Sequence, residues 1–188
     1  GQMDTVINNC LQTGKTILLL ISFEAVQVAM QRDFSNWEQW KSLYLQTFRE
    51  LVLKYRDRIF LFEGLNEVND WHGGTTAILP AYKFAEIQTE IYKITQELGV
   101  KNISCSVLSH DFQGGHVGWE YFEQAFPNKN MLPMDFVGVH LYLIDAMSMS
   151  ARLYNWSLRN YSKQLYITEW GFPGNDSQDS YISEMFDY

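Results

Sequence analysis

The feature that most limits the fold of this chain is a regular alternation of short apolar segments with longer amphipathic ones. Apolar residues fall on both faces of the short segments, which is typical of strands in a parallel sheet that helices cover. Five such segments are predicted to be strands: Lys15–Ser22, Ile59–Asn66, Ile103–Leu108, Phe136–Tyr142 and Leu165–Glu169. The alternation therefore predicts an α/β fold with parallel strands.

The segments between these strands carry helix signals. Ser35–Arg56 begins with Ser35 and has Glu38 three residues on, which predicts a capping box. Its aromatic residues recur at helical spacing, and we expect them to pack in the core. Pro80 and Gly99 are predicted to begin and end the next helix. Further helices are predicted at Thr5–Gln12, Gly118–Ala125, Met147–Tyr161 and Gln178–Asp187.

The spacing of the strands indicates which α/β fold to expect. The strands recur roughly every 38 residues, so eight strand–helix units would need about 300 residues, a normal size for a (β/α)8 barrel. The chain has 188 residues and five predicted strands. We therefore predict a single domain over residues 1–188 that forms part of a TIM barrel.

Composition excludes several classes of partner. The net charge is −8 and the sequence has no cluster of Lys and Arg, so we expect no nucleic-acid partner. The longest apolar run, Thr16–Phe23, is far shorter than the roughly 20 residues of a membrane helix. The first residues also lack the features of a signal peptide.

Acidic and aromatic residues gather where the predicted strands end. In (β/α)8 barrels the active site lies at the carboxyl ends of the strands. Glu67 and Glu169 close the second and fifth predicted strands. Two carboxyl groups that face each other across a small gap are the minimal machinery for cleaving a glycosidic bond. Trp and Tyr suit such a site, because the C–H groups of sugars pack against aromatic rings.

Three motifs on these strands resemble those of the clan A glycoside hydrolases, which are retaining (β/α)8 enzymes. Phe62–Asn69 (FEGLNEVN) resembles the acid/base motif at the end of the fourth barrel strand. His140-x-Tyr142 resembles the H-x-Y of the sixth strand, and Ile167–Gly171 (ITEWG) resembles the nucleophile strand, the seventh. The pattern is nearer to family 39 than to family 5. On this resemblance the five strands are the equivalents of strands 3 to 7, without equivalents of strands 1, 2 and 8.

The resemblance implies a role for each matched residue. Glu67 matches the general acid/base, Glu169 the nucleophile, and Asn66 the residue that binds the sugar 2-hydroxyl. His140 or Tyr142 would contact one of the two carboxylates. By position alone, a subsite for the leaving group is predicted at Trp71, His72 and Trp170. The implied activity is retaining hydrolysis of a β-linked oligo- or polysaccharide, without a cofactor and, by family expectation, outside the cell.

Two other functions remain open at this stage. A metal-dependent barrel enzyme, such as a sugar isomerase, could draw its ligands from Glu67, His72, His110, Asp111, His140 and Glu169. Alternatively, a partial barrel could bind glycans or serve a structural role without turnover. A partial barrel would also leave apolar strand edges unpaired, so we expect the chain to associate with itself or with another chain.

Overall fold

The computed structural model describes residues 2–23, 34–69, 78–109, 118–142 and 146–171. The helices are α1 (Gln2–Gln12), α2 (Trp37–Tyr55), α3 (Ala81–Leu98), α4 (Gly118–Ala125) and α5 (Ala146–Ser157). The strands are β1 (Leu18–Leu20), β2 (Leu61–Glu63), β3 (Lys101–Ile103), β4 (Val107–Leu108), β5 (Phe136–Tyr142) and β6 (Gln164–Gly171). Among the helices of these ranges, none is both long and apolar enough to cross a membrane.

All the strand pairs are parallel, and they form one sheet. β1 pairs with β2, β2 with β3, and both β3 and β4 pair with β5, which also pairs with β6. β3 and β4 are two pieces of one predicted strand, so the sheet has five strand positions. These positions curve into a half-barrel, which confirms the prediction of an α/β fold that forms part of a TIM barrel.

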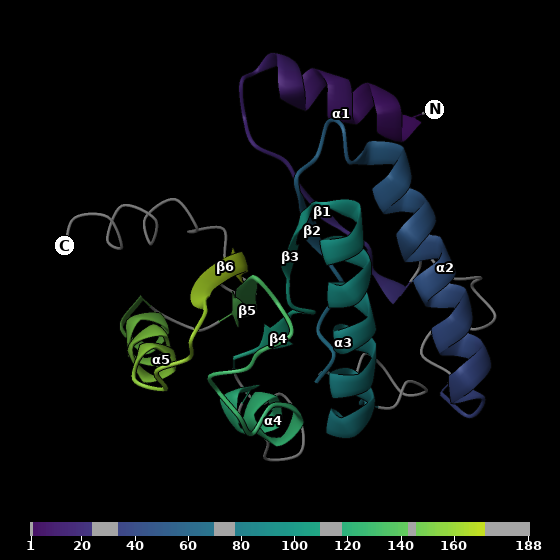
Figure 1. The fold of residues 1–188 in the computed structure, drawn as a ribbon. Coiled ribbons are helices and arrows are strands. Elements are labelled where there is room, and N and C mark those ends of the chain that lie inside the picture. Colours follow the sequence, from purple (N-terminus) through teal and green to yellow (C-terminus); the bar gives the residue numbers. More distant parts are fainter. Residues whose placement is uncertain (1, 24–33, 70–77, 110–117, 143–145, 172–188) are drawn as a thin grey trace.

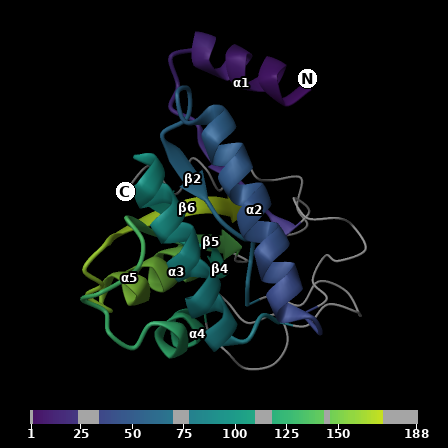
Figure 2. The same cartoon turned by 45° about the vertical axis from the view of Figure 1, so that its right-hand side comes forward.

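The helices lie outside the curved sheet. Figure 1 shows α2, α3, α4 and α5 in an arc around the strands, and Figure 2 shows the same arrangement from another side. α1 lies beyond one end of the sheet, where its Asp4 carboxylate pairs with Arg58, just after α2. The other end of the sheet, formed by the carboxyl ends of the strands, is the end that carries the candidate site.

Most predicted elements are present, with boundaries that differ mainly at the strand ends. The strand Phe136–Tyr142 and the helix Gly118–Ala125 have the predicted limits. Gly99 ends α3 in the left-handed conformation, with φ of +72°, and Pro80 precedes the first residue of that helix. The helix predicted at Gln178–Asp187 lies outside the described residues.

The predicted capping box at the start of α2 is wrong. The N-cap residue is Asn36 rather than Ser35, and its side chain makes no capping hydrogen bond. Asn36 instead donates its side-chain amide to Gln39 at 2.7 Å. The first turn of α2 packs its aromatic residues together, and Trp37 and Trp40 stack with ring centroids 5.7 Å apart.

The aromatic residues of α2 form a core, as predicted. Trp40, Tyr44 and Phe48 are fully buried. The rings of Trp40 and Tyr44 stack 5.4 Å apart, and the Tyr44 hydroxyl donates to the carbonyl of Ile21 at 2.6 Å. This hydrogen bond fixes α2 to the chain that leaves β1, and it satisfies a polar atom that would be costly to bury alone.

The two outer strands have one free edge each in the described part of the chain. There β1 pairs only with β2, and β6 pairs only with β5. Ile167 and Trp170 on β6 are 40% and 41% exposed. Large apolar side chains therefore remain open to solvent along this outer strand.

Candidate active site

The backbone beyond β2 places Glu67 against the neighbouring strand. Ser106 N–H donates to the Leu65 carbonyl, and Val68 N–H donates to the Ser106 carbonyl, both at 3.1 Å. The side chain of Asn69 then pairs with the backbone of Leu108, accepting from its N–H at 2.7 Å and donating to its carbonyl at 2.9 Å. These bonds hold the segment that carries Glu67 on both sides of the residue.

Glu67 has an unusual backbone conformation. Its φ is +46°, in the left-handed region that residues other than glycine rarely adopt. Such a conformation costs of the order of 1–2 kcal/mol, and it persists only where the surroundings enforce it. Strain of this kind concentrates at functional sites, and here it sits on the residue that matches the general acid/base.

A β-bulge in β6 determines where Glu169 lies. Val139 of β5 pairs with Ile167, but the next residue, His140, pairs with Glu169, so Thr168 is an extra residue in β6. Because side chains alternate along a strand, Glu169 in a regular strand would share the outward face of the exposed Ile167. The bulge changes this alternation and turns Glu169 toward His140 and the barrel interior.

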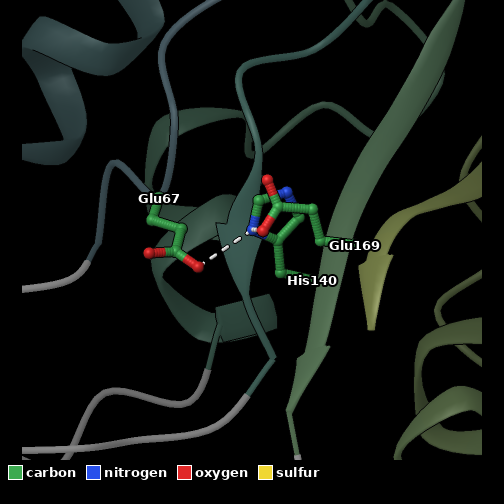
Figure 3. Close-up of side chains that lie close together, drawn as sticks. All are labelled: Glu67, His140 and Glu169. Carbon is green, nitrogen blue, oxygen red and sulfur yellow. Dashed lines mark hydrogen bonds and ion pairs between the residues drawn. The ribbon is translucent and has the colours of Figure 1, made fainter. Parts of the chain in front are cut away.

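The side chains of Glu67, His140 and Glu169 meet at this end of the sheet. Figure 3 shows the three gathered together, with the Glu67 carboxylate pointing to the His140 ring. Nδ1 of His140 lies 3.0 Å from Oε1 of Glu67 and 3.6 Å from Oε2 of Glu169. One oxygen from each carboxylate and Nδ1 all lie within 4.8 Å of one another. Glu67 follows β2, His140 lies on β5 and Glu169 lies on β6, so three separate segments of chain converge on one point.

His140 lies within hydrogen-bonding distance of the Glu67 carboxylate. The His140 side chain is fully buried, and among the described residues its Nε2 has no hydrogen-bond partner. We therefore assign the ring N–H to Nδ1, where a carboxylate can accept it. In this form His140 fixes the position of the Glu67 carboxyl group and helps to carry its negative charge.

Tyr142 contacts the other carboxylate. Its hydroxyl donates to Oε2 of Glu169 at 2.6 Å. Partial burial, the hydrogen bond to Glu169 and the negative charges of Glu169 and Glu67 all raise the pKa of Tyr142. The phenol therefore stays protonated and acts as a hydrogen-bond donor to Glu169.

The remaining predicted site residues have different outcomes. Asn66 precedes Glu67 and is half-buried, and Trp170 follows Glu169 and is 41% exposed. Trp71, His72, His110 and Asp111 lie outside the described residues. The predicted subsite for a leaving group thus has one described member, Trp170.

Glu63, a buried carboxyl group at the end of β2, has a partner that is distant in sequence. In the structure Thr168 donates its hydroxyl to Oε1 of Glu63 at 3.1 Å. The two residues are 105 apart in sequence, so no local pattern indicates the contact. The sequence analysis missed Asn69, whose side chain pairs with Leu108, for the same reason.

The distances within this cluster are short enough for its three side chains to bind one cation. Glu67, His140 and Glu169 each offer one ligand atom, and two carboxylate oxygens with an imidazole nitrogen suit a divalent transition metal. Both carboxylates already have a neighbouring donor in His140 or Tyr142. The other residues of the metal hypothesis lie outside the described residues.

Comparisons with known proteins identify the fold. No protein-family model matches the chain, and neither does any curated protein. Among solved structures, a psychrophilic glycoside hydrolase family 10 endo-β-1,4-xylanase has a TM-score of 0.62 at 10% identity, over 98% of this chain and 64% of that chain. A family 128 endo-β-1,3-glucanase from Lentinula edodes has a TM-score of 0.56 at 14% identity, over 74% of this chain and 53% of that chain.

A third solved structure agrees with these two. A family 10 xylanase with a bacterial Ig-like domain, from termite gut, has a TM-score of 0.58 at 14% identity, over 90% of this chain and 42% of that chain. The chain thus spans about half to two thirds of the length of the first two neighbours. At these identities the likeness shows the fold, a partial (β/α)8 barrel found in glycoside hydrolases. The neighbours belong to families 10 and 128, and the resemblance to families 39 and 5 stays a prediction.

Proposed function

We propose that the chain carries the catalytic centre of a retaining glycoside hydrolase that cleaves β-linked polysaccharide. One observation supports this most directly: Glu67 and Glu169, from strands far apart in sequence, present carboxylate oxygens within 4.8 Å of each other. In retaining enzymes the two carboxyl groups are only about 5–5.5 Å apart, whereas inverting enzymes separate them by about 6.5–9.5 Å. The short separation favours retention.

Glu169 is the proposed nucleophile. Its side chain is 37% exposed, so a sugar can reach it, and the Tyr142 hydroxyl orients it. An ionised carboxylate with a fixed direction can attack the anomeric carbon and form a glycosyl–enzyme ester. Donation from Tyr142 to Oε2 leaves Oε1 free of that bond for the attack.

Glu67 is the proposed general acid/base. Its side chain is only 9% exposed, and His140 holds it. In the first step it would protonate the leaving oxygen, and in the second it would take a proton from the water that cleaves the ester. The negative charge of Glu169 favours protonated Glu67 before the first step, and loss of that charge in the ester favours ionised Glu67 for the second.

The neighbours guide the choice of substrate class. One family 128 endo-β-1,3-glucanase, with a TM-score of 0.53 to this chain, was solved with laminaripentaose, and the family 10 neighbours are xylanases. Both kinds of substrate are β-linked polysaccharides with an equatorial anomeric bond. In this chain Asn66 adjoins Glu67, where it can bind a hydroxyl group of the sugar. Trp170 pairs with Leu141 and so lies on the face opposite His140 and Tyr142.

Azide rescue tests the two roles separately. We expect Glu169→Ala to lose turnover of an activated aryl β-glycoside, and azide to restore it with the α-glycosyl azide as product. Glu67→Ala should react with azide through the intact ester and give the β-glycosyl azide. The control is Glu120→Ala, which removes an exposed carboxylate on α4. Turnover of laminarin, xylan or aryl glycosides that survives in Glu169→Ala would disprove the proposal.

The second candidate function is that of a metal-dependent enzyme, and the short distances among Glu67, His140 and Glu169 favour it. Metal chelation distinguishes it from the proposed glycosidase. A glycosidase of the proposed kind keeps its activity after treatment with EDTA. Loss of activity on chelation, with recovery on adding a divalent transition metal, would support a metal-dependent enzyme instead. A folded wild-type chain that binds laminari-oligosaccharides or xylo-oligosaccharides without turnover would support the glycan-binding function.

A further inference from the structure

Glu63 is a buried carboxyl group that the proposed reaction does not use. It ends β2 and is 1% exposed. Its Oε1 accepts the hydrogen bond from Thr168, and the Thr168 hydroxyl oxygen also lies 3.3 Å from the hydroxyl oxygen of Ser106. Burying a carboxyl group is costly, so a fold retains one where its contacts repay the cost.

The contact between Glu63 and Thr168 crosses the interior of the half-barrel. β2 and β6 do not pair with each other, because β3, β4 and β5 lie between them in the sheet. The glycine on β5, Gly138, makes room for this contact. A Cβ atom at Gly138 would lie 3.1 Å from Oε1 of Glu63 and 2.8 Å from the Cγ2 atom of Ile103. A larger residue there would therefore push against the Glu63 carboxyl.

The candidate catalytic carboxylates lie close in sequence to Glu63 and Thr168. Glu67 follows Glu63 by four residues, and Glu169 follows Thr168 directly. Thr168 is also the extra residue of the bulge that turns Glu169 inward. A bulge leaves its extra residue unpaired in the backbone ladder, so contacts of its side chain can fix the position of the bulge. Glu63 and Ser106 provide such contacts.

We propose that Glu63 is a positioning residue: through Thr168 it holds the bulge of β6 and so keeps Glu169 aimed at the reacting carbon. This inference rests on the function proposed above. The neutral carboxyl accepts the Thr168 hydrogen bond and adds no second negative charge beside Glu169. It thereby couples the strand of the acid/base to the strand of the nucleophile.

The surroundings of Glu63 favour its neutral form. Tyr44 from α2, Cys105 from the β3–β4 connection and Glu169 from β6 are the ionisable groups that face it in the described residues. None of them supplies a positive charge. Burial, with a smaller contribution from Glu169, raises the pKa of Glu63 to about 8, although the Thr168 hydrogen bond opposes the shift.

Paired substitutions at Glu63 test the role in catalysis. Gln has the shape of a neutral carboxyl and keeps an acceptor for Thr168, so Glu63→Gln should retain kcat within about threefold. Glu63→Leu removes the acceptor, and we expect kcat to fall about 10- to 100-fold with KM little changed, because a misaimed group lowers the rate more than binding. Thr168→Ser should behave like Glu63→Gln, and Thr168→Val like Glu63→Leu.

A readout without turnover separates this proposal from the proposed function. In protein labelled with 13C at the Glu carboxyl and Tyr Cζ atoms, Glu63→Leu and Thr168→Val should both shift the Glu169 and Tyr142 signals. Glu63→Gln and the exposed control Glu120→Gln should leave those signals in place. If the wild type hydrolyses no glycoside but the signals respond this way, the proposed function fails and the positioning contact stands.

Two results would overturn the role of Glu63. The first is a Glu63→Leu or Thr168→Val variant that is folded and leaves the Glu169 and Tyr142 signals unchanged. The second is a Glu63→Gln variant that loses activity as severely as Glu63→Leu. The proposal requires only a neutral acceptor at this position, and Gln provides one. If Glu63→Leu does not fold, the Thr168 pair decides between the outcomes.

Discussion

Glu67 combines three properties that rarely occur together in one residue. It is a charged residue type that is 7% exposed, it has a φ of +46°, and it lies within hydrogen-bonding distance of a buried histidine. Burial and the positive φ each cost stability, and the contact with His140 offsets part of the cost of burial. A residue retained under these costs is a candidate for function, and the sequence motif and the geometry identify the same one.

The strained backbone at Glu67 leads to a prediction about stability. Glu67→Gly and Glu67→Ala both delete the side chain, so they differ only in backbone preference. We expect the Gly variant to be the more stable by about 1 kcal/mol, because Ala is strained at positive φ. Urea denaturation of the two variants measures the difference.

The same pair of substitutions at Glu120 serves as the control. Glu120 lies in α4 and is exposed, so there Ala should be more stable than Gly by about 1 kcal/mol. If Ala is the more stable residue at both positions, the left-handed conformation of Glu67 is not present in solution.

Glu63 should make the stability of the protein depend on pH. Its pKa is raised from 4.5 to about 8 in the folded chain, chiefly by burial. Between these pH values the folded state keeps a proton that the unfolded state has lost. The contribution of Glu63 to the free energy of unfolding is therefore full below about pH 4.5 and falls as pH rises to 8.

Comparison with Glu63→Gln isolates this effect, because Gln cannot ionise. The free energy of unfolding of the variant should increase relative to wild type by up to about 1.4 kcal/mol per pH unit between pH 4.5 and 8. Chemical denaturation at several pH values measures it, with Glu120→Gln as the control. A difference that stays constant with pH would show that Glu63 is ionised in the folded protein.

Among the elements, the irregular ends of the strands matter most for the site. The hydrogen-bonded ladder of β2 stops at Glu63, yet the chain stays attached to its neighbour as far as Asn69. β6 departs from regular pairing at Thr168, and this irregularity determines the direction of Glu169. A regular strand at Thr168 would move Glu169 to the other face of the sheet.

The attachment at Asn69 can be tested directly. Asn69→Ala removes both hydrogen bonds to the backbone of Leu108, so we expect a loss of about 2 kcal/mol in the free energy of unfolding and lower activity. Thermal or urea denaturation, together with kcat, measures both effects. Asn130→Ala, at an exposed position before β5, should change neither. Unchanged stability in Asn69→Ala would show that Asn69 does not anchor this segment.

At the scale of the molecule, the half-barrel has two free strand edges in its described part. The edge at β6 carries Ile167, which is 40% exposed. Exposed apolar edges favour pairing with another strand. Pairing with another strand is therefore expected at the β6 edge.

We therefore expect the chain to self-associate through the β6 edge. Sedimentation velocity should show a species heavier than the 22.0 kDa monomer. Ile167→Lys should weaken this association, because a charged side chain on an edge strand opposes pairing. Tyr82→Lys, at an exposed position on α3, is the matched control. A soluble, well-folded monomer across the concentration range would contradict the prediction.

The sequence by itself determined the fold class and indicated the candidate site residues. Apolar periodicity fixed the strands and helices, because each depends on burial of a local stretch of chain. Glu67 and Glu169 were identified because they follow buried strands, whose carboxyl ends meet in a parallel barrel. Local signals were less reliable where packing competes with them, as at the capping box that α2 does not use.

Only the tertiary structure decided how these residues meet. The bulge at Thr168, the left-handed backbone of Glu67 and the contact between Glu63 and Thr168 all depend on strands that are distant in sequence. No periodicity encodes them, because each results from fitting one strand against another inside the barrel. The pattern of residues thus provides two carboxylates, and long-range packing sets the distance between them and the direction in which each one points.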